Sequence, residues 1–208
     1  MSRAVLPRGL YAITDSGLSG TDLVRRVAQA IQGGAVMIQY RDKSTDTGRR
    51  LWEANDLQML CQSLRVPLII NDDIELALQC RAAGVHLGKD DADIVQARAT
   101  LGTQAIIGVS CYASLQQARA AQTAGADYVA FGSFFASPTK PDAERADLEL
   151  LPAARAELQI PIAAIGGITP ENGRALVDAG ADLLAVISGV FNATDSIAAA
   201  RSYAELFS

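Results

Sequence analysis

One short segment near the start of the chain carries amide and basic side chains directly after an apolar run. From position 36 it reads Val-Met-Ile-Gln-Tyr-Arg-Asp-Lys. Strand side chains alternate between two faces, so an extended segment would place Gln39, Arg41 and Lys43 on one face. Tyr40 and Asp42 would then lie on the other face. One amide and two cations on one face, at the end of a buried strand, predict a binding site for a polyanion.

Two aspartates that follow later apolar runs are candidate ligands for a hard cation. Asp72 stands in Asn71-Asp72-Asp73, and Asp91 ends the run His-Leu-Gly-Lys-Asp-Asp. Magnesium prefers carboxylate, phosphate and water oxygens over nitrogen or sulfur. Each aspartate could instead cap the helix that follows it, and we favour that role for Asp73 and Asp90. For Asp72 and Asp91 both interpretations stay open.

Three further segments fit a phosphate group. Residues 166–170 (Gly-Gly-Ile-Thr-Pro) and 187–189 (Ile-Ser-Gly) follow the last two apolar runs, and each opens a helix. Adjacent helix N-termini present backbone N–H groups to phosphate, although a pair of tight turns would give the same pattern. Residues 136–141 (Ala-Ser-Pro-Thr-Lys-Pro) carry two hydroxyls and a cation. They fit either a lid that closes on phosphate or a solvated surface loop.

No nucleophile with an adjacent base can be identified in the sequence. His86 is the only histidine, and a single histidine at a strand end is more often a structural hydrogen-bonding group than a catalyst. No base accompanies Cys111, so we interpret it as a packing residue. Trp52 is interpreted as a core or interface residue.

Short apolar runs, expected to be strands, alternate along the chain with longer amphipathic stretches, expected to be helices. Strands buried on both faces of a parallel sheet are brief and almost wholly apolar. The expected strands are residues 10–14, 35–40, 67–71, 84–87, 105–109, 127–131, 161–165 and 182–187. The expected helices are residues 20–32, 46–64, 73–82, 92–101, 114–124, 147–157, 170–178 and 195–206.

This alternation predicts an α/β fold, a single (β/α)8 TIM barrel over residues 1–208. A weak repeat supports it, because glycines 34, 84, 125 and 180 each lie between an expected helix and strand. There a glycine can take the left-handed conformation that ends a helix. A doubly wound sheet is the alternative, but no Gly-x-Gly-x-x-Gly follows the first strand. In a barrel the C-terminal strand ends surround one mouth, so the polar clusters above would share one pocket.

Composition excludes several other functions. The net charge of -5, without a block of lysines or arginines, argues against nucleic-acid binding or a polybasic membrane anchor. No apolar run approaches the roughly 20 residues of a membrane-spanning helix, and the N-terminus does not read as a signal peptide. The three widely spaced cysteines resemble neither a disulfide framework nor a zinc site. We therefore expect a cytoplasmic protein.

Taken in order, the strand-end motifs resemble those of the thiamine phosphate synthase family, from about Leu10 to the last helix. The series is Gln39-Tyr40-Arg41-Asp42-Lys43, Ile70-Asn71-Asp72, Gly84-Val85-His86-Leu87-Gly88, Ile107-Gly108-Val109-Ser110, Gly125-Ala126-Asp127-Tyr128-Val129, Pro138-Thr139-Lys140, Ala164-Ile165-Gly166-Gly167-Ile168 and Val186-Ile187-Ser188. The family has a (β/α)8 barrel. Its members join 4-amino-2-methyl-5-hydroxymethylpyrimidine diphosphate to a thiazole phosphate, giving thiamine phosphate and pyrophosphate.

The resemblance implies roles for individual residues. The pyrimidine diphosphate would be held by Gln39, Tyr40, Arg41, Asp42, Lys43, Asn71, Ser110 and Lys140. Of these, Arg41, Lys43, Ser110 and Lys140 would act in catalysis. The thiazole phosphate would be surrounded by Ser137, Pro138, Thr139, Gly167, Ile187 and Ser188. Asp72 and Asp91 would carry Mg²⁺. The implied partners are these two small molecules, with neither nucleic acid nor membrane, and a homo-oligomer stays open.

One departure and several alternatives accompany this resemblance. Many relatives have Gln-Glu-Asp after His-Leu-Gly, where this chain has Lys89-Asp90-Asp91. A thiazole tautomerase of the same fold would not need Arg41 and Lys43 together with Asp72 and Asp91. A non-catalytic thiamine-phosphate-binding protein is another alternative. A Schiff-base aldolase would want a lysine inside a strand, and no expected strand contains one.

Overall fold

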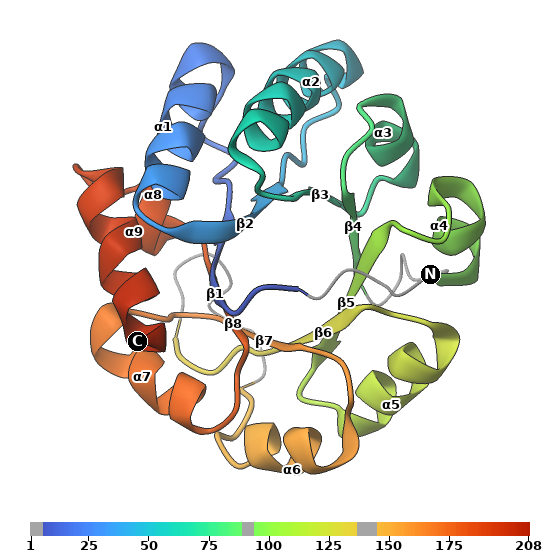
Figure 1. The fold of residues 1–208 in the computed structure, drawn as a ribbon, viewed down its shortest axis with the longest axis vertical. Coiled ribbons are helices and arrows are strands. Elements are labelled where there is room, and N and C mark those ends of the chain that lie inside the picture. The colour runs from blue at the N-terminus through green and yellow to red at the C-terminus, as the bar shows by residue number, and fades with distance from the viewer. Residues whose placement is uncertain (1–5, 89–93, 137–144) are drawn as a thin grey trace.

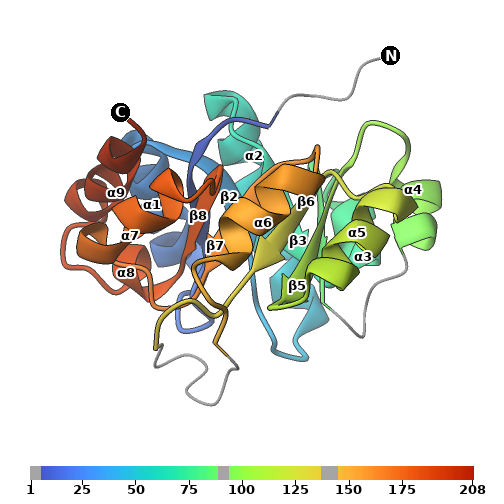
Figure 2. The same cartoon turned by 90° about the horizontal axis from the view of Figure 1, so that it is seen from below.

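Eight parallel strands close into a barrel, each hydrogen-bonded to the next, with the last paired to the first. The computed structural model describes residues 6–88, 94–136 and 145–208. Figure 1 shows the ring of strands from one end with the helices outside it, and Figure 2 shows the same layers from the side. The strands are β1 (Gly9–Ile13), β2 (Ala35–Tyr40), β3 (Leu68–Asn71), β4 (Gly84–Leu87), β5 (Ile106–Tyr112), β6 (Tyr128–Phe131), β7 (Ile162–Ile165) and β8 (Leu183–Val186). The predicted TIM barrel is confirmed.

The helices of the outer layer lie close to the expected positions. They are α1 (Gly20–Gln32), α2 (Thr47–Leu64), α3 (Ile74–Gln79), α4 (Ile94–Leu101), α5 (Leu115–Ala124), α6 (Leu150–Glu157), α7 (Pro170–Asp178), α8 (Ser188–Phe191) and α9 (Ser196–Ala204), followed by the 3-10 turn η1 (Glu205–Phe207). The four-residue α8 begins where residues 187–189 were expected to open a helix, although one turn is too short to show a helical period. No helix among residues 6–88, 94–136 and 145–208 has the length and apolarity needed to cross a membrane.

Alternation along each strand divides the core into two clusters. On β1, Leu10 and Ala12 pack outward against the helices, whereas Tyr11 and Ile13 belong to a smaller cluster inside the barrel. Leu6, just before β1, also belongs to the inner cluster. Burial on both faces explains why the strands read as continuous apolar runs.

The aspartates of the repeated Gly-Ala-Asp sequences before β6 and β8 link neighbouring strands through side-chain hydrogen bonds. Asp127 Oδ2 accepts hydrogen bonds from the backbone N–H of Ile107 at 2.8 Å and from Arg98 of α4 at 2.5 Å. Asp182 Oδ2 accepts in the same way from Ile162, at 2.9 Å, and from Arg155 of α6. Each carboxylate thus joins two strands and an outer helix.

One expectation about a single residue was wrong, and one of two alternatives for another is excluded. Gly84 does not end a helix in the left-handed conformation; Arg81 has the positive φ there, at 54°. Gly84 is instead needed for close packing, because a Cβ on it would lie 1.8 Å from the carbonyl oxygen of Ile106. Of the two roles expected for Trp52, the core is excluded, since its exposed fraction on α2 is 49%, and an interface role stays a prediction.

Candidate functional site

A pocket of about 340 Å³ opens where the C-terminal ends of the strands meet. Every strand or the residues directly after it contributes to its lining, including Tyr11 and Ile13 from β1 and Tyr112 from β5. The residue identities are mixed: apolar side chains from β6 to β8 face amides and hydroxyls from β2 to β5. This is the end of the barrel at which the sequence placed its polar clusters.

The segment after β2 keeps its strand alternation as far as position 42. Gln39 and Arg41 line the pocket, whereas the hydroxyl of Tyr40 donates to Glu53 of α2 and the carboxylate of Asp42 pairs with Arg49. The structure therefore brings the first two residues into the pocket and turns the side chains of Tyr40 and Asp42 toward α2. Any role of those two in substrate binding stays a prediction.

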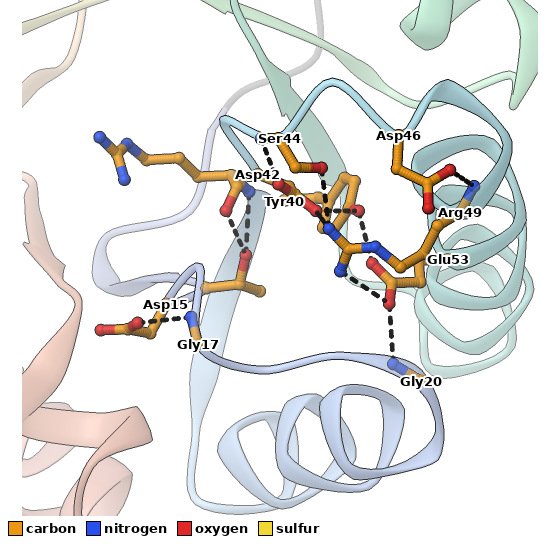
Figure 3. A network of polar contacts seen from close by, with 11 residues as sticks. Asp15, Gly17, Gly20, Tyr40, Asp42, Ser44, Asp46, Arg49 and Glu53 are labelled. Atoms are coloured by element: carbon orange, nitrogen blue, oxygen red, sulfur yellow. Dashed lines mark hydrogen bonds and ion pairs between the residues drawn. The ribbon is translucent and has the colours of Figure 1, made fainter.

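A buried network around Glu53 holds this segment in place (Figure 3). Glu53 is fully buried, and its Oε2 accepts from the Tyr40 hydroxyl at 2.6 Å while its Oε1 accepts from the Gly20 backbone N–H at 2.8 Å. Arg49 donates to Asp42 at 2.6 Å and lies 3.5 Å from Glu53. Burial and then the Glu53 carboxylate raise the pKa of Tyr40, so its hydroxyl stays protonated and can donate. The network ties α1 and α2 to Tyr40 and Asp42, the two residues on either side of Arg41 in the chain.

Arg41 is also fixed through its backbone. Its N–H donates to the Thr14 hydroxyl at 2.9 Å, and Thr14 follows β1. The backbone of Arg41 is therefore anchored to Thr14, and its two neighbours in the chain, Tyr40 and Asp42, are anchored by the Glu53 network. A residue whose backbone is already anchored loses less conformational freedom when an anion binds to it.

Lys43 and Asp72 form an ion pair beside the pocket. Lys43 Nζ donates to Asp72 Oδ2 at 2.6 Å, and the Asn71 amide donates to the same oxygen at 2.6 Å. Asn71 lines the pocket. Asp72 has a φ of 63°, which directs the chain away from β3 so that Asp73 can cap α3 by accepting from the Leu76 N–H at 2.8 Å. The expected cap at Asp73 is confirmed.

The hydrogen bonds to the Asp72 carboxylate show whether an oxygen is left to bind a cation. Lys43 and Asn71 both donate to Oδ2 of its carboxylate, and Oδ1 accepts no hydrogen bond from the described residues. One carboxylate oxygen thus remains for a metal ion. No group of three or more His, Cys, Asp or Glu side chains with ligand spacing exists among the described residues. A magnesium site would therefore need substrate oxygens and water as well.

His86 occupies a buried position between two hydroxyls. Its Nδ1 lies 2.9 Å from the Tyr128 hydroxyl and its Nε2 lies 2.9 Å from the Ser110 hydroxyl. Burial lowers the pKa of His86 to about 4, with a smaller opposing effect from the charge of Asp72, so the ring is neutral at pH 7. These contacts confirm the structural hydrogen-bonding role. His86 also lines the pocket, as expected for a residue of the strand-end clusters.

Ser110 stands inside β5 rather than after it. The strand continues to Tyr112, with an irregular register against β6 between Ser110 and Tyr112. Tyr112 takes a φ of 51° and lies at the rim of the pocket. The neighbouring Cys111 points into the core, where burial raises the pKa of its thiol to about 12. This placement agrees with the packing role expected for Cys111.

The ends of β7 and β8 form a second part of the pocket, separated from β2 by β1. Gly167, Ile187 and Ser188 all line it, with Thr169 at the start of α7. Gly167 has a φ of 62°, and a Cβ on it would lie 2.3 Å from the Ala136 carbonyl oxygen. The turn before α7 therefore needs a glycine, and α7 begins with a capping box between Thr169 and Asn172.

Several expected site residues lie outside the described ranges. They are Asp91, Ser137, Pro138, Thr139 and Lys140, together with Lys89 and Asp90. Within the described ranges, sequence reasoning missed Tyr11, Tyr112 and Tyr203 as lining residues. Tyr11 could have been found from its pattern, because an inward position of an apolar strand carries a side chain with a polar tip.

Comparison with known proteins gives one consistent result. The family model described as thiamine monophosphate synthase matches residues 10–190. The thiamine-phosphate synthase of Nitrosococcus oceani is 55% identical over 201 residues, covering 96% of this chain and 93% of the relative. That of Thiobacillus denitrificans is 52% identical and covers 97% of this chain and 95% of the relative. The solved thiamine phosphate pyrophosphorylase from Pyrococcus furiosus superposes with a TM-score of 0.87 at 35% identity, covering 96% of this chain and 95% of that one.

Proposed function

The chain belongs to the thiamine monophosphate synthase family, and from this we propose that it is a transferase that forms thiamine phosphate. The substrates are 4-amino-2-methyl-5-hydroxymethylpyrimidine diphosphate and 4-methyl-5-(2-phosphooxyethyl)thiazole, and pyrophosphate is the second product. The observation that carries the proposal is the 55% identity over 96% of the chain to a thiamine-phosphate synthase. A pocket at the C-terminal mouth of a barrel, where enzymes of this fold work, supports it.

The pyrimidine diphosphate is assigned to the side of the pocket built by β2, β3 and β5. Gln39, Arg41, Asn71 and Ser110 line this side. They offer a cation, two amides and a hydroxyl, which together can hold a diphosphate and a heterocycle. Lys43 is 59% exposed at the edge and can turn from Asp72 to a bound diphosphate. Lys140 is assigned to the same substrate by resemblance.

The thiazole phosphate is assigned to the side built by β7 and β8. Gly167, Ile187 and Ser188 line this side. Helix α7 begins next to it, and the N-terminus of a helix favours an anion. Ser137, Pro138 and Thr139 complete the set by resemblance. The two substrates then share one pocket with their phosphate groups apart.

Magnesium is proposed as the cofactor, held by Asp72 and Asp91 together with diphosphate oxygens and water. The Oδ1 atom of Asp72 accepts no hydrogen bond from the described residues, which supports this role. When bound, Mg²⁺ supplies positive charge beside the diphosphate. The Asn71 amide, which donates to Asp72 Oδ2 at 2.6 Å, keeps the carboxylate oriented.

The reaction requires that the protein stabilise the leaving pyrophosphate and position the thiazole nitrogen as the nucleophile. The bond between the pyrimidine methylene carbon and the diphosphate oxygen breaks first, leaving a pyrimidine methyl cation and pyrophosphate. The thiazole nitrogen then donates its lone pair to that carbon. Negative charge grows on the diphosphate as the bond breaks, so Arg41 stabilises the transition state more than the ground state. The thiazole nitrogen carries no proton, and therefore no general base or protein nucleophile is required.

The direct test is an assay with both substrates. Purified protein, the pyrimidine diphosphate, the thiazole phosphate and Mg²⁺ are mixed, and thiamine phosphate is measured by chromatography. Formation of thiamine phosphate and pyrophosphate in equal amounts is expected. A folded protein that binds both substrates yet forms no product would refute the proposal. Isomerisation of a thiazole carboxylate phosphate without binding of the pyrimidine diphosphate would instead identify a tautomerase.

The metal assignment has its own test. Asp72→Ala and Asp91→Ala are each expected to reduce turnover sharply at limiting Mg²⁺ while thiazole phosphate binding stays largely intact. Asp178→Ala serves as the control, because Asp178 is an exposed carboxylate on α7 paired with Arg174. Near-normal rates in either of the two variants at limiting Mg²⁺ would exclude that aspartate as a ligand.

A further inference from the structure

A chain of hydrogen bonds between side chains crosses the interior of the barrel. Gln39 Nε2 lies 2.6 Å from the Tyr11 hydroxyl, which lies 2.8 Å from the Tyr128 hydroxyl. The Tyr128 hydroxyl is 2.9 Å from His86 Nδ1, and His86 Nε2 is 2.9 Å from the Ser110 hydroxyl. Five different strands contribute these residues. All of them except Tyr128 line the pocket.

The donors and acceptors along this chain set its direction. An amide nitrogen only donates, so the Tyr11 oxygen accepts from Gln39. The Tyr11 hydroxyl hydrogen has no acceptor among the described residues other than Tyr128, and the hydrogen of Tyr128 then goes to His86. A neutral imidazole that accepts at Nδ1 carries its proton on Nε2 and donates it to Ser110.

The protonation states that this direction needs are provided by burial. Burial raises the pKa of both Tyr11 and Tyr128, so both hydroxyls keep their hydrogens. Tyr11 and Tyr128 are 1% and 0% exposed. Bulk solvent therefore does not compete for the hydrogen bonds between them.

Packing holds the tyrosine in the middle of the chain. The Tyr128 ring stacks against His86, with centroids 5.6 Å apart, and meets Tyr11 edge to face at 5.9 Å. Space for the ring comes from Gly108 on the neighbouring strand, because a Cβ there would lie 2.0 Å from Tyr128 Cζ. The position of the Tyr128 hydroxyl is therefore set by the barrel and not by the pocket contents.

We propose that Tyr11 and Tyr128 are positioning residues that hold His86 as the Nε2–H tautomer and thereby direct the hydroxyl hydrogen of Ser110 into the pocket. Ser110 accepts from His86, so its own hydrogen is left to donate to an anion. Hydrogen bonds that all run one way polarise one another and strengthen the last donor. A chain running the other way would present a lone pair of Ser110 to the same anion. The catalytic consequence rests on the proposed function, in which Ser110 faces the diphosphate.

The tautomer can be read directly because His86 is the only histidine of the chain. Protein without an affinity tag is labelled with ¹⁵N-histidine, and the two ring nitrogens are assigned by NMR at pH 7 without substrates. A single neutral Nε2–H form is expected, with Nδ1 accepting a hydrogen bond. An Nδ1–H form, or a mixture of the two, would overturn the proposal. This measurement does not depend on whether the protein forms thiamine phosphate.

Two variants separate positioning from simple loss of a hydroxyl. Tyr128→Phe removes the donor to Nδ1, so both tautomers are expected to be populated. Tyr203→Phe is the spectroscopic control: it also removes a buried tyrosine hydroxyl, which donates to the Ile168 carbonyl at 3.0 Å, and it should leave the His86 signals unchanged. A folded Tyr128→Phe protein that keeps a pure Nε2–H form would count against a positioning role for Tyr128.

Kinetics then connect the tautomer to the reaction. In Tyr128→Phe, kcat is expected to fall about tenfold, the effect of weakening one hydrogen bond to a developing charge. KM for the thiazole phosphate should change less than about twofold, since the weakened donor, the Ser110 hydroxyl, contacts the diphosphate and not the thiazole phosphate. Tyr11→Phe should show the same split with a smaller loss. Equal losses in kcat and in thiazole phosphate affinity would indicate general damage to the pocket and overturn the proposal.

Discussion

At the scale of single residues, Arg41 supplies the positive charge of the pocket. Among the described residues that line the pocket, it is the only one with a charged side chain, although the chain as a whole has a net charge of -5. Its backbone is anchored to Thr14. A single cation surrounded by apolar side chains and neutral dipoles attracts an anion more strongly than it would in water. The preference of the pocket for anions therefore depends heavily on this residue.

Replacing Arg41 tests which substrate it serves. Arg41→Ala is expected to weaken pyrimidine diphosphate binding by about 1.5–3 kcal/mol, the range for a charged hydrogen bond, which is roughly 10- to 100-fold. Thiazole phosphate binding, measured by the same titration calorimetry, should change much less. Arg25→Ala is the control, because Arg25 is an exposed arginine of α1 paired with Asp22. The reverse ranking of the two substrates would mean that the two halves of the pocket are assigned the wrong way round.

The buried thiol of Cys61 predicts a pH dependence of stability. Burial raises the pKa of Cys61 to about 12 from its ordinary value of 9.0. Between these values the unfolded chain loses the thiol proton and the folded chain keeps it. The thiol's contribution is therefore fully present below pH 9 and is lost as pH rises, by up to about 1.4 kcal/mol per pH unit.

This dependence can be isolated by comparing two variants in urea unfolding from pH 7 to 10.5. The stability difference between the wild type and Cys61→Ala should shrink above pH 9. The difference for Leu57→Ala should stay constant, because Leu57 is buried on the same helix but does not titrate. A constant difference for Cys61→Ala as well would show that the unfolded thiol is not responsible.

At the scale of elements, the segment between β2 and α2 is held from outside the barrel. The Glu53 network joins this segment to α1 through Gly20 and to α2 through Arg49 (Figure 3). The residues that face the pocket and those that build the network alternate along a single stretch of chain. Substitutions in the Glu53 network should therefore alter the pocket by changing the position of Arg41.

Glu53→Ala is expected to destabilise the fold by about 2–4 kcal/mol, because it leaves the Gly20 N–H without its acceptor and the Tyr40 hydroxyl with only the Asp42 carboxylate, 3.5 Å away. Urea unfolding at pH 7 measures this loss. Glu157→Ala is the control, since Glu157 pairs with Arg119 at the surface and its removal should cause no resolvable change. A similarly small effect of Glu53→Ala would mean that water replaces the carboxylate.

At the scale of the whole molecule, the barrel depends on close contact between its strands. Gly84 of β4 lies against the backbone of Ile106 in β5, and a methyl group there would overlap the carbonyl oxygen. Since every strand of a closed barrel has two neighbours, a displacement of β4 cannot be relieved at an edge.

Gly84→Ala is therefore expected to destabilise the barrel by at least about 2 kcal/mol, lowering Tm by at least about 5 °C. Gly48→Ala is the matched control, because Gly48 lies in α2 and a methyl group on it would come no closer than 3.7 Å to its nearest neighbour. That substitution should be neutral or stabilising, since alanine favours a helix. Thermal unfolding followed by circular dichroism distinguishes the two. Equal Tm values would show that β4 and β5 can separate without cost.

The fold could be predicted from the sequence because each strand buries both faces. That pattern located the eight strands within a few residues, although β5 runs on to Tyr112. The apolar run ends at Val109, and hydrophobicity cannot report that polar Ser110 still pairs with β6. A pattern of hydrophobic side chains does not show where a strand ends when backbone pairing sets that end.

The site could be predicted in part for a related reason. Gln39, Arg41, Asn71 and Ser110 stand at strand ends, and barrel geometry alone gathers strand ends into one pocket. The hydrogen-bond chain through Tyr11 and Tyr128 was missed, because both tyrosines look like ordinary apolar residues within their strands. Their hydroxyls meet only once β1 and β6 face each other across the barrel, which no local spacing reveals.

The pairing of β1 with β8 has a consequence for how the protein is made. Tyr11 lies on β1, the first strand of the barrel to be synthesised, whereas Ile187 and Ser188 follow β8, the last strand of the barrel. The pocket can form only after β8 has been synthesised. Until then, β1 and the growing end of the sheet remain unpaired edges, which other chains can join. Protection of the nascent chain thus matters most during translation of the second half.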